Sequence, residues 1–144
     1  MDSLKINTGV KQVIINDDPN RMIEFNPSDV VFAERFYQMV KELETKQGEY
    51  TQRAASLETQ GVDPNGVPVN IGDSLALTRE ISEYMREQID RLFGAGTSTT
   101  VFGAVLSLDA VAQFFTGIIP FIQTARSERT TRYMNSQHAG MPMK

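Results

Sequence analysis

The feature that most constrains the fold is a run of apolar residues spaced by threes and fours between residues 26 and 60. Its members are Ala33, Phe36, Val40, Leu43, Tyr50, Ala54 and Leu57. Gln47 stands at the one polar position of this heptad seam, and charged residues flank the seam. A seam of about four repeats predicts a long helix that packs in an antiparallel bundle or a short coiled coil. Gly48 should weaken that helix by roughly 1 kcal/mol relative to alanine.

The beginning of this helix has its own signature in the sequence FNPSDV at Phe25–Val30. Asn26 is the expected N-cap, and Pro27 would stand at the first helical position, where its missing N–H costs nothing. Asp29 is expected to complete a capping box, with Phe25 packing on Val30 as a hydrophobic staple. We therefore expect the helix to begin directly after Asn26.

Residues 1–25 are expected to form a β-hairpin. Residues 10–15 are rich in β-branched side chains, residues 21–25 alternate, and the sequence NDDPN at residues 16–20 is typical of a turn. Because two isolated strands are marginally stable in water, this hairpin must pack on helices or pair with another copy.

A second helix is predicted after a loop rich in glycine, proline and asparagine at residues 61–72. Asp73 is the expected cap, Gly94 the stop, and residues 26–93 together should form a helical hairpin. One face of this helix is apolar, formed by Leu77, Ile81, Tyr84, Met85, Ile89 and Leu92.

Residues 94–134 are predicted to be an apolar helical segment that follows a linker at residues 94–100. Ser107 should cap a short helix that ends at Gly117, and a further helix should begin near Ile118, with Pro120 in its first turn, and continue to about Met134. Residues 135–144 are expected to be a flexible tail. The predicted fold is mainly α, a single domain over residues 1–144 with an N-terminal β-hairpin, a long helical hairpin and compact apolar C-terminal helices.

Composition narrows the classes of function. The 144 residues carry a net charge of −4, which provides no overall positive field for nucleic acid, and the absence of cysteine fits a reducing compartment such as the cytoplasm. The first ten residues lack a secretory signal pattern. Residues 101–122 approach the length of a membrane span, but Asp109 and Gln113 fall in the middle, so we expect no membrane partner.

We find no motif for catalysis, a cofactor or a metal. The sequence GAGTST at residues 94–99 lacks the Lys-Ser/Thr pair of a phosphate loop and is better explained as a linker. His138 stands alone in the tail, and the acidic residues are interleaved with Lys and Arg as on a solvated helix surface. Asp63, Asn65 and Asp73 miss the spacing of a calcium loop. The sequence therefore predicts a protein that is not an enzyme.

Two sets of residues remain as candidate binding sites. Three arginines spaced by three, Arg126, Arg129 and Arg132, are a candidate stripe for an anionic partner, although a solvated helix end explains them better. The second set is an apolar cluster that is either core, the favoured interpretation, or a partner and oligomer surface. This cluster consists of Phe102, Phe114, Phe115, Ile118, Ile119, Phe121 and Ile122.

Two longer runs carry a resemblance to a known family. They are NDDPNRMIEFNPSDVVFAERFY at residues 16–37, and LFGAGTSTTVFGA followed by FFTGIIPFIQTARSERTTRY within residues 92–133. Both resemble a family of small proteins from tailed phages and prophages of Gram-positive bacteria, similar in role to tail assembly chaperones.

The resemblance implies a cytoplasmic protein of the bacterial host that binds phage tail proteins, the tape measure above all, and that forms a homo-oligomer. It implies no catalytic residues, because such proteins are thought to shield the tape measure before the tail tube closes. Two alternatives stay open: a structural component of the tail or virion, and a phage regulator that binds a host protein.

Overall fold

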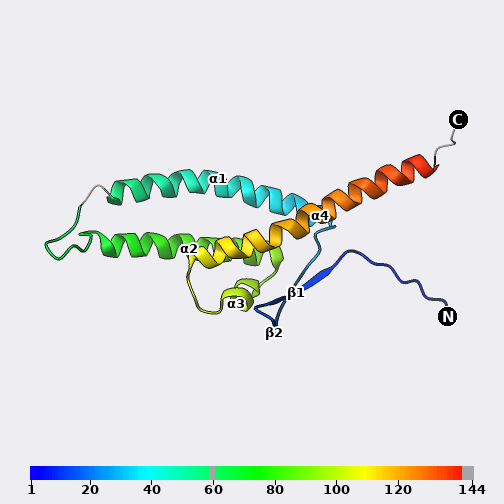
Figure 1. Ribbon diagram of the computed structural model, residues 1–144, viewed down its shortest axis with the longest axis horizontal. Helices are drawn as coiled ribbons and strands as arrows, with labels where there is room; N and C mark the ends of the chain where they lie inside the picture. Colours follow the sequence, from blue (N-terminus) through cyan, green and yellow to red (C-terminus); the bar gives the residue numbers. More distant parts are fainter. Residues whose placement is uncertain (59–60, 141–144) are drawn as a thin grey trace.

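The computed structural model describes residues 1–58 and 61–140, and among these the side chains as far as Ser127. The chain is mainly helical, with an N-terminal two-stranded hairpin followed by helices, as the sequence predicted. The elements are β1 (Lys11–Ile15), β2 (Asp18–Phe25), α1 (Val30–Glu58), α2 (Ile71–Phe93), α3 (Thr97–Phe102) and α4 (Leu108–Gly140). Figure 1 shows an elongated molecule in which α1 and α2 lie side by side, while α4 crosses their base and projects beyond it.

The hairpin is antiparallel, with Val13 opposite Ile23, but its turn is tighter than expected. Asn16 and Asp17 alone make the turn, with φ angles of 54° and 59°, a conformation that Asn and Asp tolerate better than most residues. Pro19 therefore lies in β2, where the register shifts by several residues between Ile14 and Ile15. The hairpin also begins only at Lys11, so residues 1–10 are outside it.

The beginning of α1 corrects the predicted cap. The carboxylate of Asp29 accepts a hydrogen bond from the Val31 N–H at 2.9 Å, and the helix begins at Val30 rather than after Asn26. Asn26 instead accepts a hydrogen bond from the Ser28 N–H at 3.0 Å and Pro27 is fully buried, so these residues form a turn. Val30 is half exposed, and the buried Phe25 ring lies against Phe32 and Phe93 in the core.

The helical hairpin of α1 and α2 agrees with the prediction apart from the second cap. Asn70, which is buried, precedes α2 and accepts the Ser74 N–H at 2.9 Å, while its side-chain amide donates to the Leu57 carbonyl. The helix therefore begins at Ile71, two residues before the expected cap Asp73. At the other end the Gly94 N–H donates to the Asp90 carbonyl at 2.9 Å, and the helix stops there as expected.

The expected linker at residues 94–100 contains a short helix, α3, that is fixed on two sides. The Asp90 carboxylate accepts the backbone N–H of Ser98 at 2.7 Å and its hydroxyl at 3.0 Å. The Arg21 guanidinium donates to the carbonyls of Thr100, at 3.0 Å, and Val101 at the other end of α3. These charge-assisted bonds attach α3 to β2 at one end and to α2 at the other.

The C-terminal region is one continuous helix, so the predicted break between Gly117 and Ile118 is wrong. Ser107 caps α4 as expected, accepting the Ala110 N–H at 3.2 Å, but Pro120 lies inside the helix and residues 135–140 continue it. Pro120 has no N–H to give to the carbonyl four residues earlier, which costs stability. Its ring is exposed, whereas Phe114, Ile118 and Ile122 bury the opposite face through the same turns, and that packing outweighs the lost bond.

Five elements meet at the base of the helical hairpin, where seven of the eight phenylalanines form what we call the aromatic cluster. The Phe93 ring lies 5.4 Å from Phe25, 5.5 Å from Phe32 and 5.4 Å from Phe114, in edge-on geometries that favour ring pairs. The cluster consists of Phe25, Phe32, Phe93, Phe102, Phe114, Phe115 and Phe121. Within the described part of the chain, no helix is long and apolar enough to cross a membrane.

Candidate functional site: an apolar groove between three helices

The apolar cluster predicted from the sequence divides between core and surface. Four of its members are buried: Phe102, Phe114, Ile118 and Ile122. Phe115 and Ile119 are half-buried, and Phe121 is 38% exposed. These four positions therefore belong to the core, although Phe102, Phe114 and Ile118 also line a groove beside β1.

The arginine stripe is only partly described. Arg126 is exposed on α4, and the backbone positions of all three arginines lie on that helix. The side chains of Arg129 and Arg132 lie outside the described residues. The anionic-partner stripe stays a prediction.

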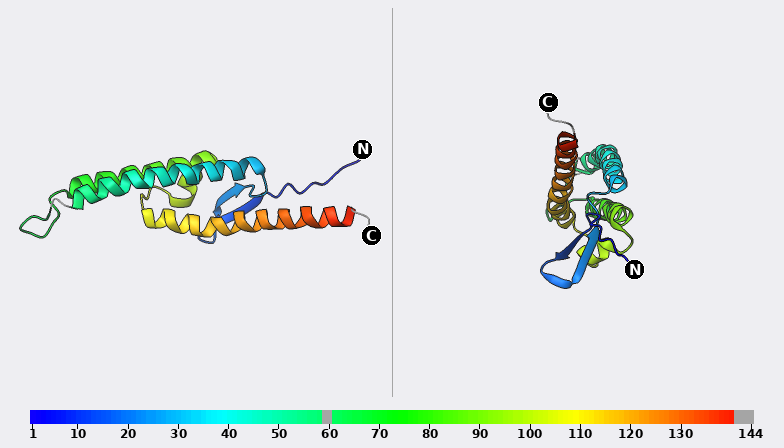
Figure 2. Two further views of the ribbon diagram at one scale, coloured as in Figure 1. Left: turned by 90° about the horizontal axis from the view of Figure 1, so that it is seen from above. Right: turned by 90° about the vertical axis from the view of Figure 1, so that its right-hand side faces the viewer.

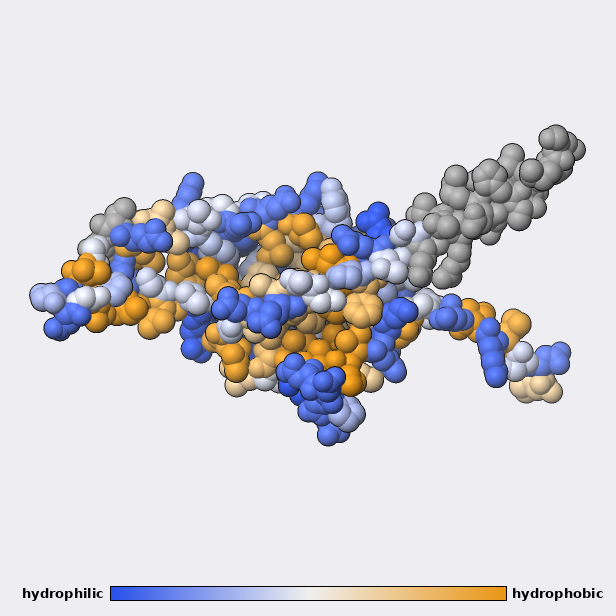
Figure 3. Space-filling view, in the orientation of Figure 1, coloured by the Kyte–Doolittle hydropathy of each residue, from blue (hydrophilic) through white to orange (hydrophobic). Residues whose placement is uncertain are grey.

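The structure instead reveals an open groove, which we call the three-helix groove, where the beginning of α4 meets the middle of α1 and α2. Its volume is about 480 Å³. Its walls are Leu43, Lys46, Gln47, Tyr50, Thr51 and Ala54 of α1, Ile81 and Met85 of α2, and Leu108, Val111, Ala112 and Phe115 of α4. Most of these side chains are apolar and half-buried, so the groove exposes an apolar floor to solvent (Figure 3).

The groove exists because α4 begins halfway along the helical hairpin. From Leu108 it runs toward the aromatic cluster and packs on α2, so it leaves the outer half of the helical hairpin uncovered (Figures 1 and 2). In the other half, the position where a third helix would pack is unfilled in the described structure. Gln47, the polar residue of the seam, is exposed at this point.

Lys46 is the only charged residue among those that line the groove. Its ammonium lies 5.9 Å from the centre of the Tyr50 ring and 5.5 Å from that of Tyr84, and 3.6 Å from the Glu49 carboxylate. The two tyrosine rings meet edge-on at 6.2 Å. Burial raises the pKa of Tyr50 and the nearby Lys46 partly opposes this shift, so the phenol is uncharged at neutral pH.

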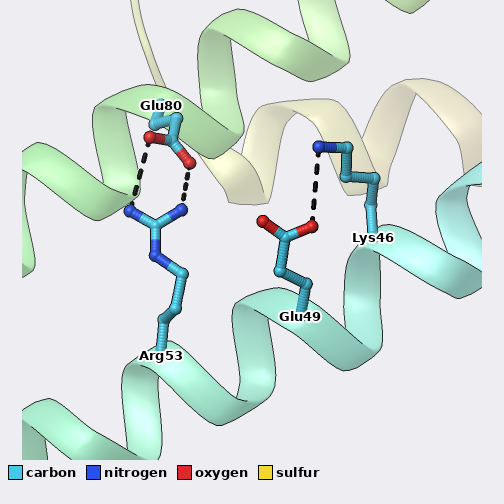
Figure 4. A network of polar contacts seen from close by, with 4 residues as sticks. All are labelled: Lys46, Glu49, Arg53 and Glu80. Atoms are coloured by element: carbon cyan, nitrogen blue, oxygen red, sulfur yellow. Dashed lines mark hydrogen bonds and ion pairs between the residues drawn. The ribbon is translucent and has the colours of Figure 1, made fainter.

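An ion pair joins the two helices near the outer end of the groove. Figure 4 shows the Arg53 guanidinium of α1 facing the Glu80 carboxylate of α2. Its two terminal nitrogens each donate to one carboxylate oxygen, and the distance from Nη2 to Oε1 is 3.3 Å. The hydrogen bond from Arg53 holds the pKa of Glu80 below its ordinary value. This exposed pair links α1 and α2 in the part of the hairpin that α4 does not reach.

Sequence reasoning did not find this groove. Leu43, Tyr50 and Ala54 belong to the predicted seam, and Ile81 and Met85 to the predicted apolar face, so all five were expected to be covered by the opposite helix. The one available signal was Gln47, because a polar residue in a seam weakens the packing of the helices at that position.

The described residues contain no group of three or more His, Cys, Asp or Glu side chains that could hold a metal ion. In α3, within the segment first considered as a phosphate loop, the Ser98 N–H donates to the Asp90 carboxylate.

One comparison with known proteins gives a match. Residues 19–140 match the model of a family described as a family of unknown function, DUF6673. No curated protein and no solved structure matches the chain significantly.

Proposed function

The chain belongs to the DUF6673 family, and we propose that it is a phage tail assembly chaperone that holds an apolar helical segment of the tape measure protein in the three-helix groove. The proposal needs no catalysis. It places the protein in the cytoplasm of a bacterial host, and it draws its biological role from the resemblance of residues 16–37 and 92–133 to such chaperones.

The observation that carries the proposal is the uncovered third-helix position. Helices of about 10 Å diameter pack 8–10 Å apart, so a groove bordered by two antiparallel helices and continued by a third suits an incoming helix. Amphipathic helices bind such grooves through apolar residues at positions i, i+3, i+4 and i+7. The apolar walls of the groove supply the matching surface.

The charge of the groove adds a selection rule for the client. Lys46 is its only charged lining residue, and Glu49 pairs with it at 3.6 Å. A client helix with an acidic residue at the edge of its apolar stripe would compete with Glu49 for Lys46, whereas a basic residue there would be repelled by Lys46. Tyr50 and Tyr84 beside Lys46 provide flat apolar surface for the same helix. The half-buried walls limit the area gained on binding, which suits a chaperone that must release its client.

The test uses two substitutions in the groove and one outside it. Ala112 is exposed on α4 and lines the groove, so Ala112→Asp should leave the fold intact and weaken binding of a tape measure helical fragment by at least about tenfold. Phe115→Asp should abolish binding. Val105→Asp, which changes an apolar residue that is exposed outside the groove, is the matched control and should bind like the original chain.

Circular dichroism establishes that each variant is folded before its affinity is measured by fluorescence titration. A folded Ala112→Asp variant with unchanged affinity would remove the groove from the proposal. Ile119, half-buried on the next turn of α4, is absent from the groove lining, so a loss of binding with Ile119→Asp alone would place the client elsewhere on α4.

The biological role is tested by a tagged pull-down from cells that are assembling tails, with partners identified by mass spectrometry. Stoichiometric recovery of the tape measure supports the chaperone. Recovery with tube or baseplate proteins, together with presence in purified virions, would identify a structural tail component instead. Recovery of a host protein alone would identify a regulator.

A further inference from the structure

Residues 3–10, with the sequence SLKINTGV, have the pattern of a β-strand without a sheet. Leu4, Ile6, Thr8 and Val10 alternate with Ser3, Lys5 and Asn7, which is the period of a strand with one covered face. No residue of this segment belongs to a strand in the structure, and Leu4 and Ile6 are 88% and 76% exposed. Figure 1 shows the segment extended away from the body of the molecule.

The outer edge of β1 has the complementary property. The sheet has two strands in the order β1-β2, so the outer edge of each strand lacks a strand partner in the described structure. On the β2 side, α3 packs against the strand and bonds to the Arg21 side chain, and the remaining open edge is that of β1. Beside this edge lies a groove of about 320 Å³ between β1 and α4. Apolar side chains dominate its walls, among them Val13, Ile15, Phe102, Phe114, Ile118 and Phe121.

The segment is held so that it leads away from the β1 edge of its own chain. The side-chain amide of Asn26 donates to the Thr8 carbonyl at 2.8 Å, and the Gly9 N–H donates to the Asn7 side chain at 3.0 Å. Gly9 has φ +94° and lies so close to Ser28 that a Cβ there would be 2.6 Å from the hydroxyl. Folding back onto β1 would break these contacts, whereas reaching another molecule would keep them.

We propose that residues 3–6 of one copy add as a third strand to the β1 edge of a second copy, with Leu4 and Ile6 covering the groove beside Phe114 and Phe121. Backbone hydrogen bonds along the edge supply affinity, and the alternating side chains fix the register. An open edge with adjacent apolar surface invites such pairing. This self-association does not depend on the proposed chaperone function, because it uses the opposite side of α4 from the three-helix groove.

The first experiment uses the absence of cysteine in the chain. A copy with Ile6→Cys is mixed with a differently sized copy that carries Val13→Cys on the acceptor strand, and disulfides are formed by mild oxidation. We expect a crosslink between the two copies, whereas Thr45→Cys, exposed on α1 and remote from the sheet, should give at least tenfold less. Equal crosslinking to Thr45→Cys would overturn the proposal. So would a chain with both Ile6→Cys and Val13→Cys that crosslinks within the monomer.

The second experiment measures association by sedimentation velocity over a range of concentrations. The full chain should associate, and the Leu4→Asp, Ile6→Asp double variant should need at least tenfold higher concentration to do so. Because Leu4 and Ile6 are almost fully exposed, these substitutions should not disturb the fold. A full chain that stays monomeric throughout, or a double variant that associates as strongly, would refute the strand addition.

Discussion

The two ends of the helical hairpin have the same kind of sequence but very different surroundings. At the base, β2, α1, α2, α3 and α4 converge and each contributes at least one ring to the aromatic cluster. At the outer end, α1 and α2 pack on each other and on the buried Asn70 that precedes α2, and most of their apolar residues are half-buried, with Leu77 the buried exception. Two helices in contact leave a groove along each side, and only a third element can close it. The base therefore stabilises the fold, while the outer half is available to bind.

Substitutions in the aromatic cluster should have the largest effect. Phe114 is buried and its ring lies 5.4 Å from Phe93, 5.9 Å from Phe102 and 5.6 Å from Phe115. Phe114→Ala should lower the free energy of unfolding by about 3–5 kcal/mol, because it removes ring contacts and leaves a cavity. Tyr50→Ala in the outer half, where the ring is half-buried, should cost only about 1–2 kcal/mol.

Urea denaturation followed by circular dichroism measures both variants. If Tyr50→Ala proved as costly as Phe114→Ala, the distinction between a stabilising base and an accessible outer half would fail.

Ser82, near the middle of α2, should give the next largest effect and in the opposite direction. Its side chain is fully buried, and its hydroxyl has no hydrogen-bond partner among the described residues. Ser82→Ala removes an unsatisfied polar group and improves helix propensity, so it should raise the free energy of unfolding by about 1 kcal/mol. Thermal denaturation is sufficient to measure this. A loss of stability would show instead that a buried water binds the hydroxyl.

Gly48 tests whether the outer half of α1 is limited by its own helix propensity. A Cβ at this position would meet nothing within 4 Å, so Gly48→Ala should stabilise the protein by up to about 1 kcal/mol. Hydrogen exchange should slow in residues 49–58, with little change near Phe93. Gly103→Ala is the matched control, because Gly103 has φ +62° and alanine there should destabilise. A destabilising Gly48→Ala would show that the outer half needs a flexible α1.

The smallest effect concerns pH and the Arg53–Glu80 pair. Because the folded state lowers the pKa of Glu80, the pair contributes stability at neutral pH, and this contribution is lost as the pH falls through the acidic range. Both side chains are exposed, so the effect should be small and weakened by salt. Melting temperatures of the original chain and Glu80→Gln should differ slightly at pH 7 and converge near about pH 3. A difference that grew in acid would contradict this sign.

Local sequence signals predicted most of the helices and the hairpin. Helical periodicity predicted the two long helices correctly, but not which residues of α1 are most covered. The buried residues of α1 are Phe32 and Met39, outside the predicted seam, whereas the apolar seam residues are half-buried. Caps were less predictable: Asn26 has the right chemistry for an N-cap, but the burial of Pro27 and the bond from Asn26 to Thr8 shift the beginning of α1 to Val30.

The break predicted at Gly117 and Pro120 failed for a related reason. Both residues disfavour a helix locally, by roughly 1 and 3 kcal/mol. A prediction from local propensity takes no account of the burial of the apolar residues on the opposite face of the same turns. Phe114, Ile118 and Ile122 are buried against β2, α2 and α3, and this burial keeps α4 continuous.

The sequence by itself determined that this chain is mainly helical, which faces of α1 and α2 are apolar, and that no familiar catalytic motif is present. The tertiary structure decided which apolar residues are core and which are surface. Phe114 and Phe115 are neighbours of the same type, and both belong to the aromatic cluster, yet Phe114 is buried whereas Phe115 is half-buried and lines the three-helix groove. Periodicity can assign a residue to a helix face, but only the position at which α4 begins, set by the fixed segment around α3, decides how much of that face is covered.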